Sequence, residues 1–191
     1  MCGNEFYDAK ENILKVAIIN NQQKVDIDIN FFKKVADYVA GKFNLSKKVE
    51  LNIIFVNKQE ISILNKKYRK KESPTDVLSF SYNNFDKQGG QQFILNKDAG
   101  RRLGLYTIGE IVICPEVAQE NIKRDKIAHF DLSTSTIFNN WDIKKEIVLL
   151  IIHGILHIYG YCHEKRDEAV EMESLQDSLL NDVLLNYFSL K

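Results

Sequence analysis

The stretch IVLLIIHGILHIYGYCH, residues 147–163, joins an apolar run to three of the four histidines in the chain. Its first six residues are all aliphatic, which is typical of a helix that is buried on nearly every side. Asp142, just before the run, is a residue type that favours the N-cap position of a helix. The stretch therefore predicts a central buried helix, and we expect the rest of the fold to pack around it.

The three histidines of this stretch have the spacing of metal ligands. His153 and His157 are four residues apart, so on a helix they share one face, with Cβ atoms about 5–6 Å apart. Gly160 is the residue type that ends helices in a left-handed turn, which lets the chain reverse and bring His163 to the same ion. Three imidazoles leave one position of a tetrahedral zinc ion open, as in catalytic zinc sites. We predict one Zn²⁺ bound by these histidines, rather than a buried helix that merely carries them on its polar face.

Gly154 argues against one metal-dependent activity. The same histidine spacing occurs in zinc peptidases with the motif H-E-x-x-H-x-x-G-x-x-H, where the glutamate is the general base. Gly154 occupies the position of that glutamate and cannot take a proton. Glycine costs a helix interior roughly 0.5–1 kcal/mol relative to alanine, so we expect it to allow close packing or to leave room for a substrate. A peptidase is therefore the weaker alternative.

The remaining segments predict an α+β fold, in which residues 1–191 form a single domain with a small mixed β-sheet packed against helices. β-Branched and apolar patterns predict strands at residues 15–20, 49–56, 77–82 and 106–114, and helices at about residues 30–43, 58–68, 115–126 and 168–188. Residues 83–104 and 128–140 are expected to be mobile surface loops. His129 stands alone in the second loop and is predicted to be a surface histidine.

Charge and cysteine content limit the possible classes of protein. The chain has 26 basic and 26 acidic residues, so its overall charge does not suggest a nucleic-acid binder. Five cations nevertheless fall within residues 66–71, which indicates either a local footprint for RNA or a solvated helix end. Three widely spaced cysteines do not form a disulfide framework. With no apolar run long enough for a membrane and no secretory signal, we expect a soluble cytoplasmic protein.

Several motifs occur together and in a fixed order. Residues 153–163 match the pattern H-G-x-L-H-x-x-G-Y-D-H, except that Cys162 replaces the aspartate. Residues 64–69 match L-N-x-x-Y-R, and residues 74–80 match P-T-D-V-L-S-F. A Gly-Glu-Ile sequence at residues 109–111 and the stretch 167–172 add weaker matches. The combination resembles the YbeY family of bacterial endoribonucleases, which act in ribosomal RNA maturation.

The resemblance implies a zinc-dependent endoribonuclease that cleaves single-stranded RNA at the 3′ end of small-subunit (16S) ribosomal RNA. It implies a role in ribosome quality control, with proteins of the small ribosomal subunit as partners. His153, His157 and His163 carry over as the zinc ligands, and the arginine of the family carries over to Arg69 as a catalytic residue. A guanidinium has the planar fork that fits a phosphate, and zinc lowers the pKa of a bound water toward about 7.

The polar residues of the second motif are not assigned a catalytic role, because turns and strand ends commonly use such residues. They are Thr75, Asp76 and Ser79.

Two departures from the family pattern bear on the site. A thiol accepts hydrogen bonds far less well than a carboxylate, so we expect Cys162 to be weakly hydrogen-bonded and not to bind the metal. The loop at residues 83–104 is longer than usual in the family. A ribosome-assembly factor whose metal is mainly structural remains the alternative function, because the histidine box is the same in both cases. The sequence makes no prediction of oligomeric state.

Overall fold

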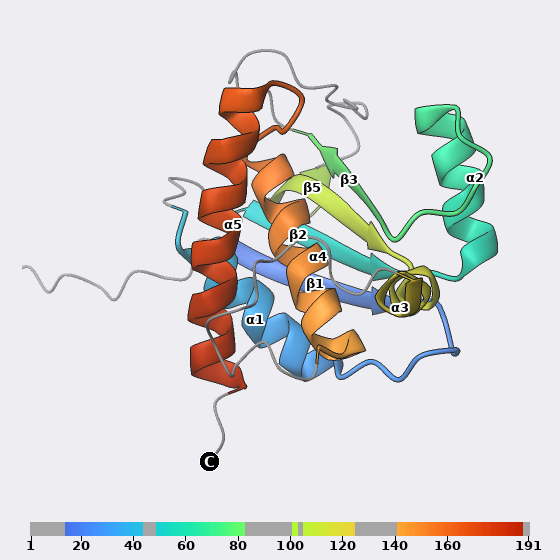
Figure 1. Ribbon diagram of the computed structural model, residues 1–191, viewed down its shortest axis with the longest axis horizontal. Coiled ribbons are helices and arrows are strands. Elements are labelled where there is room, and N and C mark those ends of the chain that lie inside the picture. Colours follow the sequence, from blue (N-terminus) through green and yellow to red (C-terminus); the bar gives the residue numbers. More distant parts are fainter. Residues whose placement is uncertain (1–13, 44–48, 83–100, 103–104, 125–140, 189–191) are drawn as a thin grey trace, which may run out of the picture.

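The computed structural model describes residues 14–43, 49–82, 101–102, 105–124 and 141–188, and Figure 1 draws the others as a thin grey trace. The elements are β1 (Leu14–Asn20), α1 (Ile29–Gly41), β2 (Val49–Phe55), α2 (Lys58–Arg69), β3 (Val77–Ser81), β4 (Arg101–Arg102), β5 (Leu105–Ile113), α3 (Pro115–Arg124), α4 (Ile143–Ile158) and α5 (Arg166–Tyr187). Each predicted strand and helix is present, with ends close to those expected from the sequence.

The sheet is mixed, as the α+β prediction requires. Its strand order is β1-β2-β5-β3, and β4 also pairs with β5. β1 and β2 are parallel, as are β2 and β5, whereas β3 and β4 run antiparallel to β5. β4 falls inside the predicted loop at residues 83–104; the rest of that loop, the loop at 128–140 and His129 lie outside the described residues.

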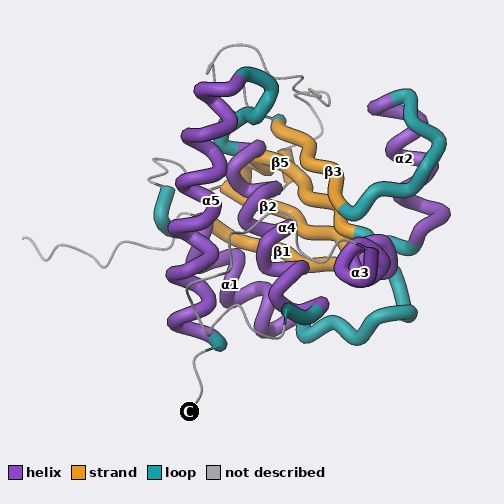
Figure 2. Tube along the Cα trace, viewed as in Figure 1, coloured by secondary structure: helices purple, strands orange, loops and turns teal. Residues whose placement is uncertain are grey.

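The two faces of the sheet carry different helices. Side chains alternate between faces along a strand, so Leu51, Ile53 and Phe55 of β2 share one face. They belong to the larger core, which includes buried residues of α1, α4 and α5. Ile54 points to the other face and packs on a smaller core that includes Ile61 of α2. In Figure 1, α4 and α5 lie side by side across the sheet, and Figure 2 shows α2 set apart from them.

α4 is the central helix that the apolar run predicts. Of its 16 residues, the following are buried: Lys145, Ile147, Val148, Leu150, Ile151, Ile152, Gly154, Ile155, Leu156 and Ile158. Asp142 is its N-cap, as expected, and accepts a hydrogen bond from the backbone N–H of Lys145 at 2.9 Å. The helix is therefore fixed at its start by a cap and along its length by apolar burial.

Glycines bring α4 unusually close to β5. A Cβ added to Gly154 would lie 2.7 Å from Cγ2 and 2.8 Å from Cδ1 of Ile111. A Cβ on Gly109 of β5 would lie 2.5 Å from the carbonyl oxygen of Phe80 and 2.9 Å from Ile158. Of the two reasons expected for Gly154, close packing is the one observed. The helix that carries the histidines is therefore packed tightly against the sheet at both glycines.

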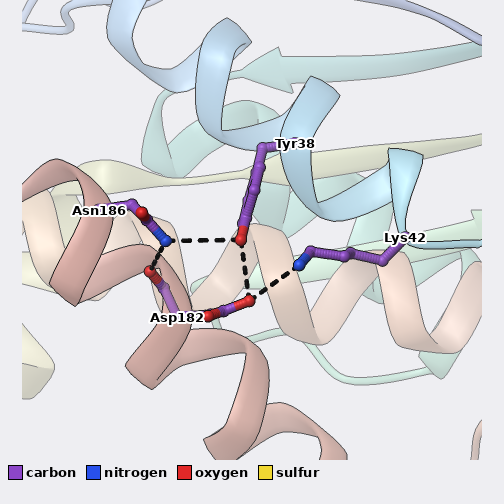
Figure 3. Close-up of polar contacts among 4 residues, drawn as sticks. All are labelled: Tyr38, Lys42, Asp182 and Asn186. Atoms are coloured by element: carbon purple, nitrogen blue, oxygen red, sulfur yellow. Dashed lines mark hydrogen bonds and ion pairs between the residues drawn. The ribbon is translucent and has the colours of Figure 1, made fainter.

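α5 is tied to α1 by a polar cluster, shown in Figure 3. The Tyr38 hydroxyl donates to Oδ2 of Asp182 at 2.8 Å, and the Lys42 ammonium lies 2.9 Å from the same oxygen. Asn186 donates to the backbone carbonyl of Asp182 at 2.7 Å. These contacts tie the C-terminal half of α5 to α1, and α5 also packs against α4.

Within the described residues, none of the helices combines the length and the apolar character needed to cross a membrane.

Candidate metal centre

The structure brings together the three histidines that the spacing predicts to be ligands. His153 and His157 lie on one face of α4, with their Nε2 atoms 3.0 Å apart. His163 follows in the loop between α4 and α5, and one ring nitrogen from each histidine lies within 4.8 Å of the others. The two helical histidines are half-buried and His163 is exposed. The cluster is therefore anchored in the protein and open to solvent on the His163 side.

The turn that returns His163 forms at Gly160, as predicted. Gly160 has a φ of 86°, a conformation that a glycine adopts without steric cost. Its N–H donates to the carbonyl of His157 at 3.0 Å, and the N–H of Tyr161 donates to the carbonyl of Leu156 at 3.0 Å. This pair of bonds is a Schellman motif. It ends α4 and turns the carbonyl of Tyr161 back toward Nδ1 of His157, at 3.0 Å.

Hydrogen bonds on the far side of each ring decide which nitrogen faces the cluster. A carbonyl oxygen can only accept, so Nδ1 of His157 carries a hydrogen and the neutral ring presents Nε2 as a lone pair. Nδ1 of His153 lies 3.0 Å from Oε1 of Gln176, which gives the same tautomer. Two lone pairs 3.0 Å apart repel each other unless a cation binds both. The donor set thus fits a transition metal that favours imidazole ligands.

The environment keeps the two helical histidines in the neutral form that binds metal. Burial lowers the pKa of His157 to about 3, and the positive charges of His153 and His163 add to this effect. Burial also lowers the pKa of His153, although the hydrogen bond to Gln176 opposes the shift. Because metal ligation requires deprotonated imidazole, little proton competition is expected at pH 7.

Arg69 is the last residue of α2 and is exposed. Its charge makes a small contribution to the lowered pKa of His157, so the guanidinium acts on the same region as the histidines. α2 ends there because Lys70 takes a left-handed conformation, with a φ of 60°. Buried Asn65 then donates to the carbonyl of Ser73 at 2.7 Å and holds the return of the chain toward β3. The catalytic role of Arg69 stays a prediction.

Asp76 lies near the site but has its own partners. Its carboxylate accepts hydrogen bonds from Thr75 Oγ1 at 3.2 Å, from the backbone N–H of Val77 at 2.8 Å and from Asn121 at 3.0 Å. Its negative charge slightly opposes the lowered pKa of His153. With three donors satisfied, Asp76 serves as an anchor at the start of β3.

Cys162 does not belong to the potential metal-binding group among the described residues. Its thiol accepts a hydrogen bond from the backbone N–H of Glu164 at 3.4 Å, which agrees with the weak hydrogen bonding expected. Gln176 is the site residue that the sequence reasoning missed. The local sequence around it carries no signal of this role, because its contact with His153 depends on how α5 packs beside α4.

Two histidines on the buried central helix of an α+β domain and a third in the loop that follows it define a potential metal-binding site. Comparison with known proteins shows which family the chain belongs to. The profile of the family described as endoribonuclease YbeY matches residues 17–184, so the chain belongs to this family, as its motifs suggested.

Relatives cover nearly the whole chain. The endoribonuclease YbeY of Mycoplasmopsis synoviae is 30% identical over 174 residues, which are 89% of this chain and 92% of the relative. That of Beutenbergia cavernae is 33% identical over 162 residues, covering 85% and 93%. The solution structure of TM1509 from Thermotoga maritima has a TM-score of 0.55 at 27% identity, covering 92% and 93%. The same overall fold is therefore present in a solved structure.

Proposed function

We propose that this chain is a zinc-dependent endoribonuclease that cleaves single-stranded RNA at the 3′ end of small-subunit (16S) ribosomal RNA. Membership of the YbeY family supports cleavage of RNA, because its relatives are named endoribonucleases. The proposal includes a cytoplasmic location and proteins of the small ribosomal subunit as partners. The observation that carries the metal dependence is the pair of Nε2 atoms of His153 and His157, 3.0 Å apart and both directed at one point by hydrogen bonds behind the rings.

In this proposal His153, His157 and His163 hold the ion. A bound zinc ion supplies Lewis acidity and lowers the pKa of a water molecule toward about 7, the range in which hydroxide becomes available. α4 holds two of the rings rigidly, and the turn at Gly160 supplies the third. Gly154 contributes no base, and the space beside it is filled by Ile111 rather than by substrate. This packing further weakens the case for a peptidase.

Arg69 is proposed to stabilise the negative charge that develops on the phosphate during cleavage. Its guanidinium is exposed and has no carboxylate partner among the described residues, whereas neighbouring Lys66 pairs with Glu72 at 2.8 Å. A planar guanidinium can donate two parallel hydrogen bonds to a phosphate, which a lysine ammonium cannot match. The remaining cations of residues 66–71 would attract RNA without acting on the reacting atoms.

The test is single-turnover cleavage of a short single-stranded RNA by wild type, Arg69→Lys and Lys70→Ala, with zinc analysis of each protein. Losing one well-placed donor to a transition-state oxyanion costs on the order of 10²–10³ in rate, and we expect this loss for Arg69→Lys with unchanged zinc content. Lys70→Ala should weaken RNA binding modestly and flatten its salt dependence. Equal and small effects of both changes on the cleavage rate would mean that residues 66–71 only attract RNA electrostatically and that Arg69 has no specific catalytic role.

A chelator arm separates the proposal from the alternative of an assembly factor with a structural metal. Removal of zinc should abolish cleavage and leave the metal-free protein folded, because α4 is held by its apolar contacts. Protein that binds zinc and RNA but leaves the RNA intact, under conditions that exclude contaminating nuclease, would favour the assembly factor.

A further inference from the structure

We propose that Gln176 is a positioning residue of the metal site. Through its Oε1 atom it fixes His153 in the tautomer with hydrogen on Nδ1, and so directs the Nε2 lone pair of that ring at the ion. This inference rests on the metal site proposed above, and it extends that site to α5, a helix that supplies none of the three ligands.

The contact joins two helices that are separate in the chain. Gln176 follows His153 by 23 residues, and its Oε1 lies 3.0 Å from Nδ1 of the ring. Histidine ligands of metals almost always donate their other ring N–H to a carboxylate, a carbonyl or a water, and this bond fixes both tautomer and ring orientation. The amide oxygen of Gln176 occupies the place of that acceptor.

The two helical histidines are held in different ways. His157 donates to a backbone carbonyl in the turn that directly follows its own helix, and that group has no N–H to offer. Gln176 presents an amide, which has an oxygen on one side and an NH₂ group on the other. If the amide turned over, its NH₂ group would donate to Nδ1 of His153, and the hydrogen would move to Nε2, the atom needed for the metal. Whether His153 presents the Nε2 lone pair to a metal therefore depends on one side chain, that of Gln176.

The position of Gln176 is set by contacts away from the histidines. Around it, α5 buries the apolar residues Met172, Leu179, Leu180, Val183 and Leu184. Farther along the helix, Asp182 binds Tyr38 of α1 and Lys42, the residue that follows α1 (Figure 3). The amide is thus carried to His153 by a helix that is already docked. A neutral amide is also a weaker acceptor than a carboxylate, so we expect glutamine to hold the ring of His153 less firmly than glutamate would, and the metal affinity to be lower as a result.

Three variants test the proposal. Gln176→Met keeps the length of the side chain and removes the acceptor, and Gln176→Glu keeps an acceptor that cannot turn into a donor. Asn181→Leu is the matched control, because it removes an exposed amide from the same helix that takes no part in the cluster of Figure 3. Zinc affinity is measured by competition with a chelating indicator, and the tautomer of His153 is read by ¹⁵N NMR of the metal-free proteins.

We expect Gln176→Met to lower zinc affinity about 10–100-fold, the usual cost of losing such a partner, and to shift His153 away from the Nδ1–H tautomer. Gln176→Glu should bind zinc at least as tightly as wild type, and Asn181→Leu should bind it equally. If wild type binds zinc and Gln176→Met matches it in affinity and tautomer, the role of Gln176 is refuted and the metal site stands. If wild type binds no zinc, the proposed function itself fails. Should Gln176→Met not fold, an affinity loss in folded Gln176→Glu would overturn the proposal.

Discussion

The two sides of α4 differ in what they tolerate. On the sheet side, Gly154 packs against Ile111 with no room for a methyl group. On the opposite side, His153 and His157 are half-buried and bonded to polar groups of a neighbouring helix and a turn. One helix thus carries a rigid apolar contact and a polar site within the same turns. Changes on the sheet side should affect folding first, and changes on the histidine side should affect metal binding first.

The largest expected effect is the loss of metal from His157→Ala. Removing one of three ligands should cost more than the roughly 10–100-fold that accompanies loss of a partner behind a ligand. The apolar side of α4 is untouched, so the metal-free variant should unfold at a denaturant concentration close to that of wild type. Elemental analysis after gel filtration checks this expectation. Undiminished zinc in the variant would show that His157 is not a ligand.

The next effect is the pH dependence of the metal-free protein. The folded pKa values of His153 and His157 are lowered below the ordinary value of 6.5, so the unfolded chain binds more protons than the folded one. Their contribution to stability should be fully present above pH 6.5, fall as the pH drops below that value, and continue to fall toward about pH 3 for His157. Urea unfolding at several pH values measures this trend. His157→Ala should show a flatter dependence; an identical slope would contradict the assignment.

A change on the sheet side of α4 should lower the stability of the protein and leave its metal binding largely intact. In Gly154→Ala the new methyl group would overlap Ile111, and overpacking of this kind costs about 1–3 kcal/mol. Gly41→Ala is the matched control, because a Cβ at Gly41 meets nothing within 4 Å. Chemical denaturation of both variants should show a loss of stability only for Gly154→Ala. The folded fraction of Gly154→Ala should still bind zinc, unless α4 moves away from the sheet and carries the histidines with it.

The smallest effect is expected beyond the end of α4, at Gly160. A residue with a Cβ in the left-handed conformation costs roughly 1–2 kcal/mol, so Gly160→Ala should be destabilised by about that amount. It should also lose some zinc affinity, because the same turn presents the carbonyl of Tyr161 to His157. Gly160→Asn should do better than Gly160→Ala, since asparagine tolerates this conformation. Equal stability of wild type, Gly160→Ala and Gly160→Asn would mean that a side chain at this position causes no strain in the turn.

Much of the fold could be predicted because its signals are local. The N-cap at Asp142, the apolar run that follows it and the glycine at position 160 each act within a few residues of themselves. They fixed the position, burial and end of α4, and with them the meeting of three histidines. Burial along α5 was less predictable: Leu175 is only half-buried, whereas Val183 is fully buried.

Other features depend on contacts that a single segment does not contain. Whether Gly154 made room for packing or for substrate was decided by Ile111, which reaches it from a different strand. Gln176 could not be recognised as a site residue until α5 was rotated and docked beside α4. The order of the strands likewise follows from pairing between distant segments, and no local pattern encodes it.

The closeness of the three histidines in the chain has a consequence for the order of events during synthesis. They fall within eleven residues, and closing so short a loop costs little chain entropy. An unfolded chain can therefore offer the same three imidazoles to an ion, and any such binding reduces the stability that the metal adds to the native state. Gln176 comes from another helix and reaches His153 only when the protein has folded. A nascent chain can thus offer its three imidazoles to an ion early, before the contact between His153 and Gln176 has formed.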